Sequence, residues 1–379
     1  MGRIPVTIIT GFLGSGKTTL LNRVLRQPDL VDTAVIINEF GEIGLDHELV
    51  QASDGEVVLL PNGCLCCAVR GDFVRTLDDL HRRRVQGSVL PFSRVIVETS
   101  GLADPGPIIQ ALLAEPSLHA RYVLESVLAT VDVINGAATM KAHLEAVKQI
   151  AVADRIVLTK QDMLAAETAL ARMDVLTRHL RHLSPAAMIE EATTAIREIC
   201  RATPFDPERK ACDPQAWLGA HHYESHAGHR HAQGNEHHGH HSGRVRSFCI
   251  TRDEPIDEVA LEMFLSGLGK HLGPGLLRLK GIVNVAQHPD RPAIVHGAQT
   301  LLHELAWLQQ WPGADRRTRL VFITLDTDQE EIEDMLGLME RMQSRTVQAK
   351  ARAAGLAADS ARGLPLSELS EKPLPRPVA

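Results

Sequence analysis

The residues with the clearest chemical meaning lie near the start of the 379-residue chain, where glycines, a lysine and a threonine occur at a fixed spacing. The segment from Gly11 to Thr18 reads GFLGSGKT, follows an apolar run and opens a helical stretch, so it matches G-x-x-x-x-G-K-[ST] in the expected context. Gly14 and Gly16 let backbone N–H groups converge on phosphate oxygens, Lys17 brings charge to the β- and γ-phosphates, and the Thr18 hydroxyl suits Mg²⁺. The segment predicts a nucleoside triphosphate site.

A second pattern bears on the base of that nucleotide. Thr159, Lys160, Gln161 and Asp162 follow an apolar run at the place where GTPases carry N-K-x-D. The Asp162 carboxylate can accept hydrogen bonds from N1–H and the 2-amino group of guanine, and adenine lacks that amino group. Thr159 replaces the usual asparagine, and read alone the segment is equally compatible with an ordinary helix start. Its position favours guanine.

An acidic residue ends another apolar run, in the segment RVIVETSG that closes at Gly101. This segment resembles the Walker B region of GTPases, with Glu98 placed to orient Mg²⁺ or a water and the Gly101 N–H placed to sense the γ-phosphate. Lys17, Glu98 and Gly101 are therefore the candidate catalytic residues. The alternative is a strand-end acid that caps a turn.

Three thiols fall within four residues, at Cys64, Cys66 and Cys67, after another apolar run. Thiolates favour Zn²⁺ and Cu(I), and three sulfurs from one polar turn leave a fourth position open, which suits an ion that must leave again. In the loop NEFGEIGLD we expect Glu42 to complete this site and Glu39 to lie nearer Mg²⁺. Structural cysteines, a redox pair and a loop of solvated acids are the alternatives.

Nine of the 19 histidines gather in one short tract of low apolar content. Neutral imidazoles bind Zn²⁺, Ni²⁺, Cu²⁺ and Co²⁺ alike, so the tract cannot select a metal, but it can raise the local metal concentration near the cysteines. A solvated linker that binds nothing is the alternative. The auxiliary ligands are His221, His222, His226, His229, His231, His237, His238, His240 and His241.

The elements that position these residues follow from an alternation of apolar runs and helical stretches over the first two hundred residues. The runs lie at 6–10, 34–37, 57–60, 95–97, 127–131 and 156–158, and the helical stretches at 18–26, 72–84, 107–114, 140–150 and 165–181. This alternation predicts an α/β fold, a P-loop NTPase domain over 1–202 whose mainly parallel sheet binds ligands at the carboxyl ends of its strands.

The pattern changes after residue 202. Residues 203–244 carry prolines, glycines and the histidines, which predicts a His-rich flexible linker. Apolar order resumes over 245–327 and predicts a smaller α+β C-terminal domain. Residues 328–379 predict a helix from 329 to about 354 and a disordered proline-rich tail.

Composition narrows the function further. A net charge of −7 argues against nucleic acid as a partner, and no apolar run approaches the roughly 18 residues that cross a bilayer. Six cysteines, three of them clustered, indicate thiol chemistry in a reducing compartment rather than a disulfide framework. We therefore expect a cytoplasmic protein with neither nucleic acid nor membrane as a partner.

Taken together and in this order, the segments GFLGSGKTTLLN, NEFGEIGLD, NGCLCC, VIVETSGLADPGPI and VLTKQD resemble the CobW-like GTPases. Among these the chain is most similar to the zinc-regulated GTPase metalloprotein activators, whose hallmark is the C-x-C-C turn. The resemblance is strong over residues 4–165 and weaker over 245–325, where LLRLKG resembles the family's C-terminal domain. It is absent after about residue 330.

The resemblance implies a SIMIBI-class G domain with weak GTP hydrolysis that delivers metal to a client metalloprotein. It implies GTP, Mg²⁺ and Zn²⁺ as cofactors and leaves Co²⁺ open, because some branches of the family serve cobalt or iron; a homodimer is also compatible with it. It assigns metal binding to the cysteines together with the Glu42 loop. It assigns phosphate binding to Gly14, Ser15, Gly16, Lys17, Thr18 and Thr19.

The hypothesis that follows is a metallochaperone in which GTP orders the loops around the cysteines and hydrolysis relaxes them, changing the affinity for metal. Three alternatives remain. They are a metal buffer or sensor that nucleotide merely stabilises, a cobalt- or iron-inserting GTPase of the CobW-like type, and a P-loop kinase of a small metabolite. The guanine pattern and the thiols count against the kinase.

Overall fold

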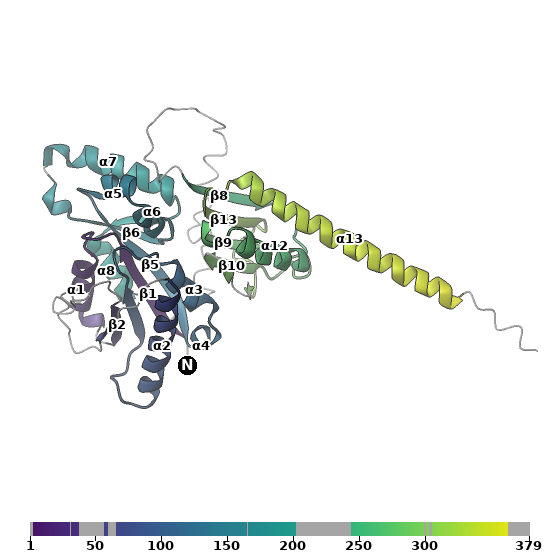
Figure 1. The fold of residues 1–379 in the computed structure, drawn as a ribbon, viewed down its shortest axis with the longest axis horizontal. Helices are drawn as coiled ribbons and strands as arrows, with labels where there is room; N and C mark the ends of the chain where they lie inside the picture. The colour runs from purple at the N-terminus through teal and green to yellow at the C-terminus, as the bar shows by residue number, and fades with distance from the viewer. Residues whose placement is uncertain are drawn as a thin grey trace, which may run out of the picture.

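The computed structural model describes residues 3–30, 32–37, 57–59, 66–164, 166–201, 244–298, 301–302 and 305–362. Two sheets organise these residues. Figure 1 shows the first sheet with helices on both faces, a smaller second sheet beside it, and a long final helix, α13 (Gln329–Arg362), that extends away from both.

The first sheet is parallel, and its described strands lie in the order β3-β2-β4-β1-β5-β6-β7. The chain moves outward from β1 in one direction first and then in the other, so the loop that follows β1 leaves the sheet at the switch point where ligands bind. The strands are β1 (Ile4–Gly11), β2 (Thr33–Ile37), β3 (Val57–Leu59), β4 (Arg94–Glu98), β5 (Tyr122–Asp132), β6 (Arg155–Thr159) and β7 (Met188–Glu191).

Both faces of this sheet are covered by helices because successive strand residues point to opposite sides. Ile8 packs in a core with α2 (Cys66–Val85), α3 (Gly106–Ala114), α6 (Leu144–Ala151) and α7 (Ala166–Leu183). Its neighbour Ile9 packs in a separate core with α1 (Lys17–Leu25) and α8 (Ala192–Arg201). The short elements are η1 (Pro28–Leu30), α4 (Pro116–His119), α5 (Gly136–Ala142) and η2 (Gln161–Met163).

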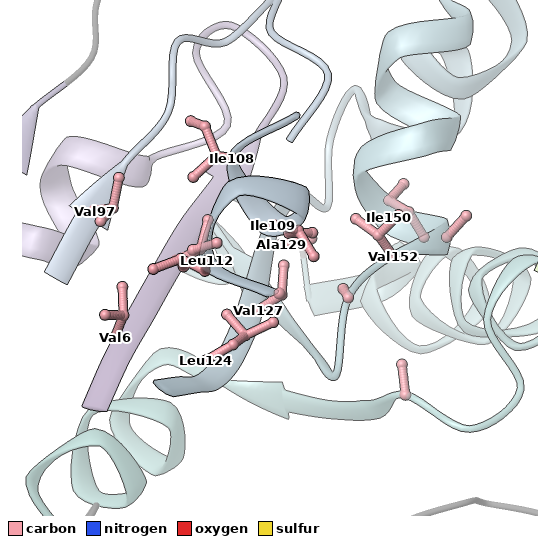
Figure 2. Packing of buried hydrophobic residues seen from close by; sticks show 14 of the residues in the cluster. Val6, Val97, Ile108, Ile109, Leu112, Leu124, Val127, Ala129, Ile150 and Val152 are labelled. Carbon is pink, nitrogen blue, oxygen red and sulfur yellow. The ribbon is translucent and has the colours of Figure 1, made fainter. Parts of the chain in front are cut away.

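Figure 2 shows the first of these cores, where Val6 and Val127 on the sheet lie against Leu112 of α3. Ile150 on α6 and Val152 just beyond it continue the same core toward the second sheet. The apolar packing therefore joins α3 and α6, which flank the loops at the carboxyl ends of β4 and β5.

The second sheet is antiparallel, with described strands in the order β11-β10-β9-β13-β8 and β12 paired to β10. The helix α12 (Glu258–His271) and the first turns of α13 cover one face, where Phe264, Phe322 and Leu336 are fully buried. The remaining elements are β8 (Val245–Arg252), η4 (Gly273–Gly275), β9 (Leu276–Val283), β10 (Ala293–Ala298), β11 (Leu301–Leu302), β12 (Ala306–Trp307) and β13 (Thr318–Leu325).

The other face of the second sheet meets the first body around Asp154, which precedes β6. Arg278 and Lys280 on β9 donate hydrogen bonds of 2.6 and 2.7 Å to the Oδ1 atom of Asp154. Arg278 also donates to the backbone oxygen of Val152. Leu277 joins the apolar core of the first body, so a buried ion cluster and apolar contacts together hold the two bodies.

The predicted fold class is confirmed, and several elements differ in extent. The helix α2 begins at Cys66 and not at Asp72. Gly71 lies inside this helix, although glycine disfavours helix interiors and therefore suggested a loop in the sequence. Cys66 and Cys67 therefore belong to the backbone of a helix, and the prediction that they lie in a turn was wrong. The helix predicted over 140–150 is broken at His143, whose backbone is extended, into α5 and α6.

Two further elements of the structure were not predicted from the sequence, and a third was predicted too short. The strand β7 and the helix α8, which follows it directly, were not predicted. The strand has no apolar run, and Met188 and Glu191 at its ends are exposed, so nothing in the sequence marked it. The last helix continues to Arg362, past the predicted end near 354. The loop NEFGEIGLD, Cys64, the histidine tract and the proline-rich tail lie outside the described residues. Among the helices that are described, none has the length and apolarity of a membrane span.

Candidate functional site

The loop between β1 and α1 has the backbone conformation of a phosphate cradle. Gly14 and Gly16 have positive φ angles of 69° and 93°, a region that side-chain-bearing residues rarely adopt. A Cβ atom placed on Gly14 would have no atom within 4 Å, so the backbone here faces open space. The helix α1 begins directly afterwards at Lys17, and the first N–H groups of a helix have no partner within it, so they are available to an anion at this end.

The hydroxyl of Thr18 in α1 donates a 2.7 Å hydrogen bond to Oε1 of Glu98, which ends β4 and is 5% exposed. Lys17 folds back to donate to the backbone oxygen of Phe12 at 3.3 Å. A hollow of about 270 Å³ is lined by Lys17, Thr18 and Glu98, together with Gly101 and Ile37. The three candidate catalytic residues, Lys17, Glu98 and Gly101, thus converge on one hollow beside the cradle.

A second hollow, of about 450 Å³, lies on the other side of the cradle and is lined by Thr19, Thr159, Lys160 and Asp162. The hydroxyl of Thr159 donates a 2.7 Å hydrogen bond to the backbone oxygen of Ser15. The threonine that departs from N-K-x-D therefore ties this loop directly to the cradle. Leu20 and Leu158 also line this second hollow, and a mixed apolar and polar lining beside the cradle is the arrangement expected of a pocket for a nucleotide base.

Sequence reasoning missed the opposite wall of this second hollow. Glu191, Ala192 and Thr193, at the junction of β7 and α8, line it. Because β7 is the outermost strand of the sheet and lacks an apolar run, no pattern in the sequence marked its carboxyl end. Its parallel pairing with β6, in which Leu158 lies opposite Glu191, is what brings these residues to the base-loop side.

A third hollow, of about 200 Å³, adjoins the cradle and α5 and is lined by Asp132 and Lys160 among others. Lys160 donates a 2.7 Å hydrogen bond to Oδ2 of Asp132. Oδ1 of Asp132 accepts from the backbone N–H of Ile134 at 2.7 Å, and Oδ2 also accepts from the side-chain amide of Asn135 at 3.0 Å. Burial opposes the charge of this carboxyl, yet the hydrogen bonds from Lys160 and Asn135 hold the pKa of Asp132 below its usual value. Sequence reasoning also missed Asp132.

The segment after Glu98 is held against the cradle and against α6. A Cβ atom on Gly101 would approach the backbone N of Leu13 to 2.8 Å, so only glycine allows this contact without a shift. The side-chain amide of Gln149 on α6 donates to the backbone oxygens of Gly101 and Ala103 at 3.1 and 3.0 Å. Lys148 pairs with Asp104 at 3.1 Å. The γ-phosphate-sensing segment predicted from sequence therefore rests on α6.

The side chains of the predicted ligands of the transferable metal lie outside the part of the chain that the structure describes. Cys64, Glu39, Glu42 and the nine histidines lie outside the described residues, and so do the side chains of Cys66 and Cys67. Within the described parts of the chain, no cluster of three or more His, Cys, Asp or Glu side chains is placed to hold a metal ion. The strand ends that precede the two loops are described: Ile37 pairs with Leu59 on one side and with Glu98 on the other.

Family models match both bodies. Residues 5–188 match the family described as "CobW/HypB/UreG, nucleotide-binding domain", and residues 245–339 match "Cobalamin synthesis protein cobW C-terminal domain". The two matches fall on the parallel and the antiparallel sheet respectively.

Individual relatives agree with these matches. The chain is 30% identical over 333 residues to "Zinc chaperone YjiA" of Escherichia coli, which covers 88% of this chain and 97% of the relative. It is 32% identical over 197 residues to "Zinc-regulated GTPase metalloprotein activator 1" of Schizosaccharomyces pombe, covering 50% of this chain and 46% of that protein. The crystal structure of Zn(II)-bound YjiA GTPase from E. coli superposes with a TM-score of 0.59 at 25% identity, over 89% of this chain and 99% of that one.

Proposed function

Because the chain belongs to the CobW/HypB/UreG family of nucleotide-binding proteins and carries the CobW C-terminal domain, we propose that it is a GTP-hydrolysing metallochaperone that passes a metal ion to a client metalloprotein. The observation that carries the GTPase part is the hydrogen bond between Thr18 and Glu98 beside the phosphate cradle. It brings a P-loop hydroxyl and a strand-end carboxylate together where Mg²⁺ is held in P-loop enzymes.

In this proposal the cradle formed by Gly14, Ser15 and Gly16 binds the phosphates, and Asp162 selects guanine. The residues fit Mg²⁺ because Thr18 and Glu98 supply hard oxygen ligands at the rim of the same hollow. Bound there, Mg²⁺ neutralises charge on the β- and γ-phosphates. Lys17 adds a fixed positive charge, and the Gly101 N–H serves as the sensor of the γ-phosphate.

The metal site of the proposal consists of Cys64, Cys66 and Cys67 with Glu42, and its cargo is Zn²⁺, the ion named for the E. coli and S. pombe relatives. The strand order supports its place. The loops that carry Glu42 and the cysteines leave the sheet after Ile37 and Leu59, which are paired neighbours, and Glu98 is the next strand end along. Loops that start at adjacent strand ends can share a nucleotide-dependent arrangement.

The coupling proposed is that GTP orders these loops and fixes one ligand geometry, and that hydrolysis relaxes them and changes the affinity for zinc. A tenfold change in affinity needs only about 1.4 kcal/mol, which the movement of one ligand supplies. The histidines between 221 and 241 would raise the local zinc concentration, and the C-terminal domain would contact the client.

The test is a competition of the protein with a chelator for Zn²⁺, in the presence of Mg²⁺ and either GDP or a non-hydrolysable GTP analogue. The full chain is compared with a Cys66→Ala/Cys67→Ala variant, in a background where the nine histidines are changed to asparagine so that they do not mask the site. A nucleotide-dependent change of about tenfold or more that the cysteine changes abolish supports the chaperone. Equal affinity in both nucleotide states indicates a metal buffer instead.

A further inference from the structure

Lys160 has an unusual position, since it lines all three hollows around the phosphate cradle. Its backbone is left-handed, with a φ of 59° that is uncommon for a residue with a side chain. Such a conformation costs of order 1 kcal/mol and persists where surrounding contacts hold it. The hydrogen bond of the adjacent Thr159 to Ser15 fixes the backbone on one side.

The side chain of Lys160 is held at the end of the neighbouring strand β5. The ammonium group of Lys160 is 2.7 Å from Oδ2 of Asp132, a residue that is 7% exposed. Asp132 is itself immobilised by Ile134 and Asn135, so its carboxylate is a fixed anchor rather than a mobile surface acid. The backbone of Lys160 is held beside Thr159 and its ammonium is held at Asp132. The stem between these two points therefore has little freedom where the residue lines the three hollows.

We propose that Asp132 is a positioning residue for guanine nucleotide binding, which holds the Lys160 stem as a wall of the base pocket. The inference rests on the proposed function, because it assumes that the second hollow takes guanine. Because the Asp132 carboxylate holds the ammonium at the end of β5, the apolar stem of Lys160 is fixed where the residue lines the second hollow.

The test uses Asp132→Asn, which keeps the shape and one acceptor but loses the charge, in the full chain with Mg²⁺. Dissociation constants are measured for GDP and for inorganic pyrophosphate, which fills the cradle without a base. We expect the constant for GDP to rise about tenfold, or about 1.4 kcal/mol, and that for pyrophosphate to change by less than about twofold. In a Lys160→Met background, Asp132→Asn should cause no further loss for GDP.

The matched control is Glu190→Gln. Glu190 on β7 forms a comparably buried pair with Arg155 at 3.0 Å, at the other end of β6, and this change should leave GDP binding unaltered. Should Asp132→Asn unfold, Lys160→Met alone tests the inference, since it leaves the backbone contacts of Asp132 intact and should weaken GDP but not pyrophosphate.

Three results would overturn the inference: an unchanged constant for GDP, equal weakening of pyrophosphate, or the same loss in the Lys160→Met background. The first two mean that the pair does not shape the base pocket, and the third means that Asp132 acts through its turn alone. If the unaltered chain does not bind GDP, the proposed function fails and the inference falls with it. Normal GDP binding by both the unaltered chain and Asp132→Asn overturns the inference alone.

Discussion

The Thr18 hydroxyl, in the first turn of α1, donates a 2.7 Å hydrogen bond to Oε1 of Glu98 at the end of β4. These residues are eighty positions apart in sequence, and the pairing of β1 with β4, in which Ile9 lies opposite Glu98, brings them together. A hydroxyl and a carboxylate already in contact need little rearrangement to receive a divalent cation. The relationship makes Glu98 the first residue to test.

Glu98→Gln should lower GTP hydrolysis roughly tenfold to a hundredfold and raise the Mg²⁺ concentration needed for half-maximal rate, because an amide is a weaker ligand and base than a carboxylate. The measurement is phosphate release over a Mg²⁺ titration. Glu190→Gln, which alters a strand acid away from the cradle, serves as control. An unchanged Mg²⁺ dependence would remove Glu98 from the proposed site.

Asp162→Asn should reverse the base preference. The asparagine amide donates a hydrogen bond where the carboxylate accepted one, which suits the 2-oxo group of xanthine and leaves the guanine amino group without an acceptor. We expect GDP to bind at least roughly a hundredfold more weakly and xanthosine diphosphate to bind more tightly than before. Competition between the two nucleotides measures this. Equal losses for both would mean that Asp162 does not contact the base.

Gly101→Ala should reduce hydrolysis more than it reduces GDP binding. The added Cβ would lie 2.8 Å from the backbone N of Leu13, so the segment after β4 must shift away from the cradle. The rate of phosphate release and the dissociation constant for GDP are compared in the same variant. Gly71→Ala in α2 is the control, since no atom lies within 4 Å of its Cβ position and helix propensity favours alanine.

Asp154→Ala should loosen the contact between the two bodies, because it strands the cations of Arg278 and Lys280 at a buried position. Removing one partner of a buried ion cluster costs about 3–5 kcal/mol, whereas replacing all partners with apolar residues costs less. Urea unfolding should show this loss for Asp154→Ala and a partial recovery for the same change combined with Arg278→Met and Lys280→Met. If Asp154→Ala unfolded at the same urea concentration as the unaltered chain, the apolar contacts alone would hold the bodies.

The stability of the C-terminal body should depend on Asp315 in a defined pH range. Hydrogen bonds from Arg317 lower the pKa of Asp315 from 3.8 to about 2. A carboxyl whose pKa is depressed by folding stabilises the native state above its unfolded value, and this contribution is lost as the pH falls from about 4 toward 2.

The difference in urea midpoint between the unaltered chain and Asp315→Asn should therefore be constant from pH 7 to 5 and shrink by pH 3. Asp290→Asn is the control, since Asp290 pairs with Arg316 in a more exposed place. A difference that does not change with pH would mean that Asp315 acts through shape and not through charge.

The sequence determined the local parts of this site. The glycine spacing of 11–18 dictates the backbone of the cradle, because positive φ angles at Gly14 and Gly16 are open only to glycine at low cost. The alternation of apolar runs with helices determined a parallel sheet whose strand ends carry the loops, and it identified Glu98 and Asp162 as acids at two of those ends.

Only the tertiary structure decided which strand ends are neighbours. The anchor of Lys160 at Asp132 depends on the pairing of β5 with β6, and the wall formed by Glu191 depends on an edge strand that has no apolar signature. The contact of Arg278 with Asp154 joins residues 124 positions apart. Such contacts arise from strand order and register, which are set by the packing of the whole chain, and no local pattern of residue types encodes them.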